Sequence, residues 1–368
     1  MIRQIEPWID IEELRQLKRV VDSTFVTEGV LTTEFELGIK ELTGAKHAIA
    51  ITNGTLATYV CLKALGIGVG DEVIVPNLTF IATSNAVIMA GAMPVFCDVL
   101  LDTYCMDYHR LEELVSDKTR AIMPVHLYGQ SANLIEIMKI AKKHELYVVE
   151  DAAQGVGVTY MGRHVGTYGD CGMLSFYGNK TITCGEGGVI LTNDDEIAKQ
   201  CYKLKNHGRS QKGIFIHEDV GFNFAFTEMQ AAIGISQLKK LGRIKDKKNK
   251  IYQKYIDELK GVGDLKPCYL DPNCEPVFWF TSFETQHVVT LAEHLLDNNI
   301  QTRRFFYPLH LQPCYTKNKD IIGRNDRDFS TSEEVYQRGI SLPSSYLLSD
   351  GEQDKVIDCI RGFYEDRL

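Results

Sequence analysis

The chain has 368 residues, of which 44% are hydrophobic and 24% charged, so it can bury a sizeable core and exceeds the size at which one core usually stops growing. Its formal net charge is −9, which argues against nucleic acid or an anionic membrane as a partner. No stretch approaches the ~20 apolar residues of a membrane helix, and the ten cysteines form no CxxC pair, which argues against a disulfide framework or a zinc site.

Two local segments bear on where the protein works and what it binds. Residues 1–16 (MIRQIEPWIDIEELRQ) contain no apolar signal-peptide core, and scattered cysteines suit reduced thiols, so we expect a cytoplasmic protein. The lysine-rich run at residues 239–250 (KKLGRIKDKKNK) is the main exception to the acidic composition. Its spacing fits a solvated helix face better than a binding patch.

Helix and strand patterns alternate along the first part of the chain. The predicted helices cover residues 11–21, 33–42, 53–65, 79–90, 111–115, 134–144, 195–206, 227–241 and 244–260. The predicted strands cover residues 47–52, 72–75, 95–99, 121–125, 146–149 and 173–177. Such alternation predicts an α/β fold with a mostly parallel sheet covered by helices on both faces.

The alternation weakens near residue 193, and helices then dominate. We therefore expect a large domain at residues 1–245 and a smaller C-terminal α/β domain at residues 246–368. Segments 278–283 and 291–298 and roughly the last 30 residues would form the smaller domain.

Lys180 is the residue around which a function can be built. It lies in the stretch SFYGNKTITCGEGG (residues 175–188), on a glycine-containing loop that follows a short apolar strand. A lysine beside apolar and aromatic neighbours is unusual, because burial lowers the pKa of the ammonium. Such an amine is nucleophilic and suited to a Schiff base with a carbonyl compound or with pyridoxal phosphate. On this stretch alone, a surface lysine in a glycine turn fits equally well.

Three further features favour a cofactor that carries a phosphate. Gly54 and Thr55 follow Asn53 between a strand and a helix, where backbone N–H groups can bind an anion, although the same turn is also an ordinary helix cap. Asp151 ends a buried strand, where a carboxylate can pair with a pyridinium nitrogen or serve in a structural ion pair. Ser175 precedes Lys180 and could offer its hydroxyl to the same phosphate.

Five motifs together resemble the DegT/StrS group of nucleotide-sugar aminotransferases, over about residues 20–310. They are NGT (53–55), PNLTFIAT (76–83), EDAAQGVG (150–157), SFYGNKTITCGEGG (175–188) and GFNFAFTEMQAAIG (221–234). The resemblance implies pyridoxal 5′-phosphate as cofactor and the fold type I architecture of aspartate aminotransferase. Residues 123–130 (MPVHLYGQ) look most similar to the branch that aminates C4 of a nucleotide-linked 4-keto-6-deoxyhexose, giving products of the perosamine and viosamine type.

The resemblance also implies a role for each residue of the site. Lys180 would bind the cofactor as a Schiff base, Asp151 its pyridine nitrogen, Gln154 the region of its phenolic oxygen, Phe80 its ring face, and Gly54, Thr55 and Ser175 its phosphate. Asn223 would reach the phosphate from a partner subunit. The expected assembly is therefore a homodimer with shared active sites.

The sequence indicates the residues that would bind the substrates less clearly than those that would bind the cofactor. The expected amino donor is L-glutamate, and two substrates that share one site imply ping-pong kinetics. Arg209 and Arg304, with its neighbour Arg303, are candidates for the donor carboxylate or the diphosphate, although exposed arginines are common. His310 could contact the substrate, but a packed histidine is the preferred interpretation.

Three other functions remain alternatives. A 3-aminotransferase of the same group would use the same motifs. A sugar dehydratase of the related branch carries histidine in place of the lysine, so Lys180 argues against it. A regulatory protein that only binds pyridoxal phosphate would not need both Lys180 and Asp151. The nucleobase could be that of GDP, dTDP or UDP, because the resemblance becomes weaker after about residue 268, in the region expected to help form the substrate cleft.

Overall fold

A seven-stranded sheet lies at the centre of the protein. The computed structural model describes residues 1–209, 213–323 and 328–367. In spatial order, the strands are β1 (His47–Ile51), β9 (Gly188–Thr192), β8 (Cys171–Ser175), β5 (Tyr147–Asp151), β4 (Thr119–Ile122), β2 (Glu72–Pro76) and β3 (Met93–Cys97). The predicted mostly parallel α/β sheet is thus confirmed.

One strand of this sheet was missed by the sequence analysis. β9 runs antiparallel to both of its neighbours, β1 and β8, whereas the pairs from β8 through β5, β4 and β2 to β3 are parallel. β9 follows the loop that carries Lys180 and is buried along its whole length. The chain therefore turns back directly into the sheet after this loop, with no helix between β8 and β9.

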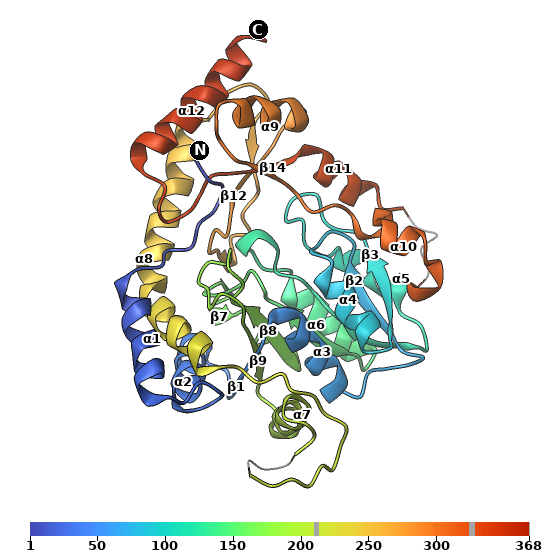
Figure 1. The fold of residues 1–368 in the computed structure, drawn as a ribbon. Coiled ribbons are helices and arrows are strands. Elements are labelled where there is room, and N and C mark those ends of the chain that lie inside the picture. The colour runs from blue at the N-terminus through green and yellow to red at the C-terminus, as the bar shows by residue number, and fades with distance from the viewer. Residues whose placement is uncertain (210–212, 324–327, 368) are drawn as a thin grey trace.

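Helices cover both faces of the sheet (Figure 1). The α-helices of the described residues, including those beside the second sheet, are α1 (Ile11–Ser23), α2 (Val30–Thr43), α3 (Gly54–Ala64), α4 (Ala82–Met89), α5 (Leu111–Leu114), α6 (Leu134–Lys143), α7 (Asp195–Lys205), α8 (Glu228–Glu258), α9 (Val288–Asp297), α10 (Pro313–Thr316), α11 (Ser330–Arg338) and α12 (Asp350–Glu365). The two helices predicted at residues 227–241 and 244–260 are wrong as separate elements, because α8 continues through Gly242, where a glycine costs only about 1 kcal/mol relative to alanine.

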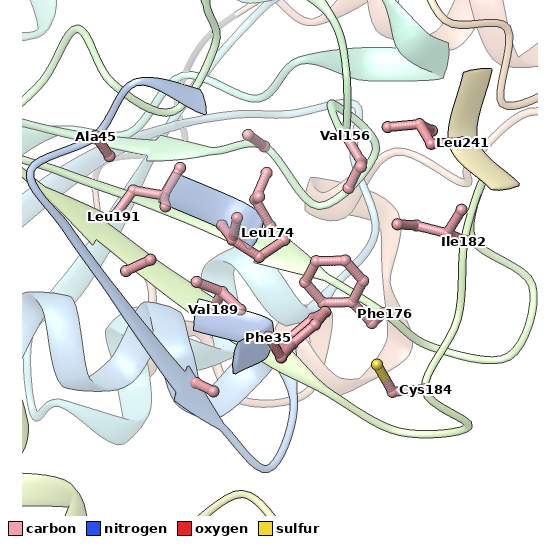
Figure 2. Close-up of a cluster of buried hydrophobic side chains, with 14 of the residues drawn as sticks. Phe35, Ala45, Val156, Leu174, Phe176, Ile182, Cys184, Val189, Leu191 and Leu241 are labelled. Carbon is pink, nitrogen blue, oxygen red and sulfur yellow. The ribbon is translucent and has the colours of Figure 1, made fainter. Parts of the chain in front are cut away.

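Alternate residues of each strand pack on opposite faces, as the two-residue period of a strand requires. In β8, Leu174 packs with Phe35 of α2 and Phe176, while its neighbour Met173 packs with residues of α3 on the other face. Figure 2 shows the first of these layers, where the rings of Phe35 and Phe176 meet edge to face with centroids 5.2 Å apart. Burial on both faces explains why the strands read as continuous apolar runs.

The lysine-rich run 239–250 is not a uniformly solvated face, which corrects the sequence interpretation. Lys239 and Lys250 are exposed, but Lys240 and Lys248 are buried on the inner side of α8. Lys240 is paired with Asp10 and Glu13 of the α1 region, at 2.9 and 2.7 Å. The inner side of α8 therefore carries two buried lysines that helical spacing alone did not identify.

A second, antiparallel sheet is built from residues after α8. Its strands, in spatial order, are β10 (Lys266–Pro267), β12 (Thr281–Glu284), β14 (Gly339–Leu342) and β13 (Arg303–Arg304). A further small sheet pairs β11 (Cys274–Glu275) with β6 (Thr159–Tyr160), which pairs with β7 (Arg163–His164). The predicted boundary near residue 245 falls inside α8, and the division at that residue stays a prediction. Among the described helices, none combines the length and apolar character needed to cross a membrane.

Candidate active site

A cavity of about 680 Å³ opens at the carboxyl ends of the parallel strands β5 and β8. This edge of an open α/β sheet is where ligands usually bind. Its wall brings together most of the residues singled out in the sequence: Gly54, Thr55, Phe80, Asp151, Gln154, Ser175 and Lys180. Segments that are far apart in the chain therefore meet around one space.

The first turn of α3 forms one end of the cavity and is suited to a phosphate. The Asn53 side chain caps the helix by accepting the N–H of Leu56 at 3.0 Å. The N–H groups of Gly54 and Thr55 have no acceptor within the helix, because the first turn never does. A side chain at position 54 would not fit, since a β carbon there would lie 2.8 Å from Met173 Cε and 3.1 Å from Ser175 Cβ. The glycine lets the backbone come close to Ser175, so N–H groups and a hydroxyl face the same space.

Asp151 is held rigidly at the end of β5. Its Oδ2 accepts the hydroxyl of Thr83 at 2.6 Å, and its Oδ1 accepts the N–H of Ala153 at 3.1 Å. The residue is nearly buried, with 6% of its surface exposed. Two hydrogen bonds orient the carboxylate, which lines the cavity and suits a partner that carries an N–H⁺ group.

Lys180 lines the same cavity and is half-buried. Removal from water lowers the pKa of its amine to about 8, the nearby Asp151 raises it and the positive Arg303 lowers it again. A lysine with this pKa is partly in its free-base form near neutral pH. A lowered pKa is the property that the sequence analysis expected of a nucleophilic lysine, and the catalytic role of Lys180 stays a prediction.

Gln154 and Phe80 complete the wall between these groups. The Gln154 side-chain oxygen accepts the N–H of Tyr128 at 2.7 Å, which turns the NH₂ end into the donor that can serve a ligand. Phe80 has 56% of its surface exposed and its ring lies 6.0 Å from that of Phe306, which also lines the cavity. An open aromatic face on a cavity wall can stack on a planar ligand.

Four other predicted site residues lie outside the cavity wall. Asn223 is exposed in an extended segment that bridges to Asn206, and Arg209 bonds to Asn206 rather than toward the cavity. Within one chain, neither reaches the space between Lys180 and Asp151.

The other two are Arg304 and His310. The guanidinium of Arg304 stacks on Tyr336, 4.3 Å from the ring centroid. His310 is packed, as the preferred interpretation had it: its Nδ1 meets Asn77 Nδ2 at 2.8 Å and its Nε2 meets Glu333 at 3.3 Å. Burial lowers the pKa of His310, which favours the neutral form of its ring.

Of the two neighbouring arginines considered for the substrate, Arg303 lines the cavity and Arg304 does not, because adjacent residues of the strand β13 point to opposite sides. The wall also contains residues that the sequence analysis had not selected. Trp279 and Phe306 come from the segments around the second sheet and line the cavity. The aromatic run Phe278–Phe280 was the available signal, but an apolar run reads equally well as core.

Comparisons with known proteins were made on the whole chain. Residues 7–361 match the model of the DegT/DnrJ/EryC1/StrS aminotransferase family. A GDP-perosamine synthase of Vibrio cholerae is 35% identical over 99% of this chain and 99% of its own length. A GDP-perosamine synthase of Caulobacter vibrioides is 37% identical over 95% of this chain and 95% of its own length. A dTDP-3-amino-3,4,6-trideoxy-alpha-D-glucose transaminase of Streptomyces venezuelae is 33% identical over 98% of this chain and 96% of its own length.

A solved structure agrees with these matches. The crystal structure of DesV of Streptomyces venezuelae, in complex with a ketimine intermediate, superposes with a TM-score of 0.91 at 32% identity. The match covers 96% of this chain and 95% of that one.

Proposed function

Because the chain belongs to the DegT/DnrJ/EryC1/StrS aminotransferase family, a group of pyridoxal-phosphate-dependent sugar aminotransferases, we propose that it moves the amino group of L-glutamate to C4 of a nucleotide-linked 4-keto-6-deoxyhexose. The observation that carries the proposal is the Lys180 amine, with a pKa of about 8, in one cavity with the carboxylate of Asp151 and the first turn of α3. The two GDP-perosamine synthases support C4 of a 6-deoxyhexose, which is the amino position in perosamine.

The residues present fit the cofactor. The end of the cavity lined by Gly54, Thr55 and Ser175 would hold its phosphate, because the N–H groups of the first turn of α3 have no acceptor within the helix and a hydroxyl lies beside them. Asp151 would hold the pyridine nitrogen in its protonated form, and Phe80 and Gln154 would contact the ring face and the ring oxygen. When bound there, pyridoxal phosphate supplies an electron sink for the carbanion left when a proton is removed next to nitrogen.

The protein groups have defined tasks in this reaction. Lys180 Nζ is the base that removes the proton from Cα of the donor and the acid that returns a proton on the other side of the transfer. Its lowered pKa places it between the two forms near neutral pH, as an acid–base group requires. Arg303 on the same wall is suited to bind a carboxylate of the donor, since a guanidinium recognises carboxylates through paired hydrogen bonds.

The pKa of Lys180 leads to a pH prediction for cofactor uptake. In the full-length protein stripped of cofactor, only the free amine reacts with added pyridoxal phosphate. Because the pKa is lowered from 10.5 to about 8, the uptake rate should rise with pH and level off above a midpoint of about 8. Stopped-flow absorbance between pH 6 and 10 measures this midpoint. A midpoint near 10.5 would show that Lys180 is fully solvated.

We also propose that the active sites are completed by a second copy of the chain. The segment before α8 exposes apolar side chains, including Phe215 at 81% and Val220 at 83%, beside the exposed Asn223. Large apolar side chains that are exposed in one segment are typical of a protein interface. If Asn223 reaches the phosphate bound by the other chain, each site takes its lysine and its asparagine from different subunits.

A mixing experiment tests this arrangement. Lys180→Ala and Asn223→Ala proteins should each have little activity, but a mixed dimer contains one site with both lesions and one with neither. After exchange of subunits, activity should recover to about a quarter of the wild-type value, because half of the randomly formed two-fold dimers are mixed and each has one intact site of two. No recovery in heterodimers verified by differential tags would mean that Asn223 acts within its own chain.

The proposed substrate can be tested directly. Purified protein and L-glutamate are incubated with 4-keto-6-deoxyhexoses linked to GDP, dTDP or UDP, and with the matching 3-keto compounds, and products are identified by mass and by NMR. We expect a 4-amino-4,6-dideoxy product. A 3-amino product would instead support the second candidate, a 3-aminotransferase, which is favoured by the likeness to the dTDP-3-amino-3,4,6-trideoxy-alpha-D-glucose transaminase.

The cysteines support a proposal for the compartment. All ten are free thiols, most of them buried, which suits a reducing environment. We therefore propose the cytoplasm, and fractionation of the producing cells would test it.

A further inference from the structure

Trp279 makes two contacts with the loop that carries Lys180. Its indole Nε1 donates a hydrogen bond to the carbonyl oxygen of Asn179 at 2.7 Å, across 100 residues of sequence. The Lys180 Nζ lies 4.2 Å from the centroid of the Trp279 ring. One rigid side chain thus touches both the backbone next to the reactive lysine and its amine.

The backbone of Trp279 is fixed in turn by a buried lysine. Lys248, on the inner side of α8 and 3% exposed, donates to the carbonyl oxygens of Trp279 at 3.1 Å and of Ser344 at 2.8 Å. Both acceptors are neutral, and burial lowers the pKa of Lys248 to about 7. Burial of a lysine that makes only two hydrogen bonds to carbonyl oxygens costs free energy. This cost is consistent with a role for Lys248 in fixing the position of the Trp279 backbone.

These contacts address a specific difficulty of the proposed reaction. A lysine side chain has four rotatable bonds, and proton transfer requires its amine within hydrogen-bond reach of the reacting carbon. The ring of Trp279 provides an attractive face for an ammonium and excludes water from that side. The hydrogen bond from Trp279 to the Asn179 carbonyl oxygen fixes the backbone next to Lys180. The flexible side chain of Lys180 cannot fix this backbone by itself.

We propose that Trp279 is a positioning residue for Lys180 and that Lys248, through the Trp279 carbonyl, anchors it to α8. This inference rests on the proposed role of Lys180 as the cofactor-binding amine. The charged or titratable groups that line the same cavity are Asp151 from β5, Arg303 from β13, and Tyr177 and Glu186 from the loop of Lys180. They are unchanged in the variants below, so a shift in pH dependence reports on Trp279.

The test follows uptake of pyridoxal phosphate by the cofactor-stripped full-length protein from pH 6 to 10. Trp279→Leu keeps the wall apolar but removes the ring, so the ammonium loses its attractive face and the midpoint should fall from about 8 by roughly half a unit to one unit. Trp279→Phe keeps a ring but loses the N–H donor, so the rate constant for uptake should fall about 3–10-fold with a smaller shift of the midpoint. Lys248→Met should slow uptake in the same way.

A matched control is available at the second tryptophan of the chain. Trp8 also packs on cations, with Lys240 and Arg243 at 4.6 and 4.3 Å from its ring centroid, but it does not line the cavity. Trp8→Leu should leave the midpoint and the rate unchanged. A folded Trp279→Leu protein that behaves like Trp8→Leu would overturn the inference.

The remaining outcomes are also decisive. If Trp279→Leu does not fold, Trp279→Phe replaces it in the test, because phenylalanine keeps an aromatic ring at this position. An unchanged rate of cofactor uptake in Trp279→Phe would then overturn the inference. If uptake is slowed in Trp279→Phe but unchanged in Lys248→Met, Trp279 positions Lys180 without help from Lys248. A wild-type protein that takes up no cofactor at any pH would instead contradict the proposed function itself.

Discussion

Replacement of Lys180 by alanine is expected to lower kcat by at least about 10³-fold, because the variant loses the group that transfers protons at the donor Cα. The loss should exceed that of any other single substitution in the cavity, since the same side chain is also the covalent attachment point of the cofactor. Single-turnover kinetics with L-glutamate measures the effect, and mass spectrometry after borohydride reduction shows whether the cofactor is attached at position 180.

Two controls make this result specific. Lys199→Ala removes an exposed lysine of α7 and should keep wild-type turnover. In Lys180→Ala, a small primary amine added to the buffer should restore part of the activity, because the cavity would admit it next to Asp151. Near-normal turnover in Lys180→Ala, or cofactor attached to another lysine in the wild-type protein, would contradict the assignment.

Asp151→Asn should give the second largest effect, a fall in kcat of about 10²–10³-fold with cofactor still bound. Asparagine has nearly the same shape: its one side-chain oxygen can still accept the N–H of Ala153, and its NH₂ can donate to the Thr83 hydroxyl oxygen, so the fold is retained. It cannot keep a pyridine nitrogen protonated, because it carries no negative charge. Turnover, cofactor content and thermal unfolding of the variant separate the electronic effect from a structural one.

Asp170→Asn is the matched control. Asp170 lies before β8, at the other end of the strand from the cavity, and its Oδ2 accepts the N–H of Val148 at 2.8 Å. Its pKa is raised, chiefly by desolvation, so this position tolerates a neutral group. Turnover in Asp170→Asn should stay within a few-fold of wild type. If Asp151→Asn also keeps nearly normal kcat, the carboxylate of Asp151 is structural.

The family was predictable from the sequence because its marks are local. The motifs around Gly54, Asp151 and Lys180 each consist of adjacent residues, and the match over residues 7–361 confirms the predicted resemblance. Their meeting in one cavity was also predictable, because residues at the carboxyl ends of parallel strands share one edge of the sheet.

Positions that depend on partners distant in sequence were beyond such reasoning. Arg303 and Arg304 are adjacent and chemically identical, and only the pairing of β13 with β14 decides which of them faces the cavity. In the same way, nothing in the run at residues 239–250 marks Lys248 as the buried lysine, because its acceptors belong to segments 31 and 96 residues away.

The sequence by itself therefore determined the family, the cofactor and the order of most of the main elements, and it predicted candidate site residues. Hydrophobic periodicity indicates the elements, and motifs at the ends of strands indicate the site. Both are properties of short segments. The tertiary structure alone decided that β9 returns antiparallel after the Lys180 loop, that α8 is one helix, and that Trp279 lies against Lys180. These features arise from packing between distant segments, whose free energy depends on which surfaces meet rather than on the pattern within either one.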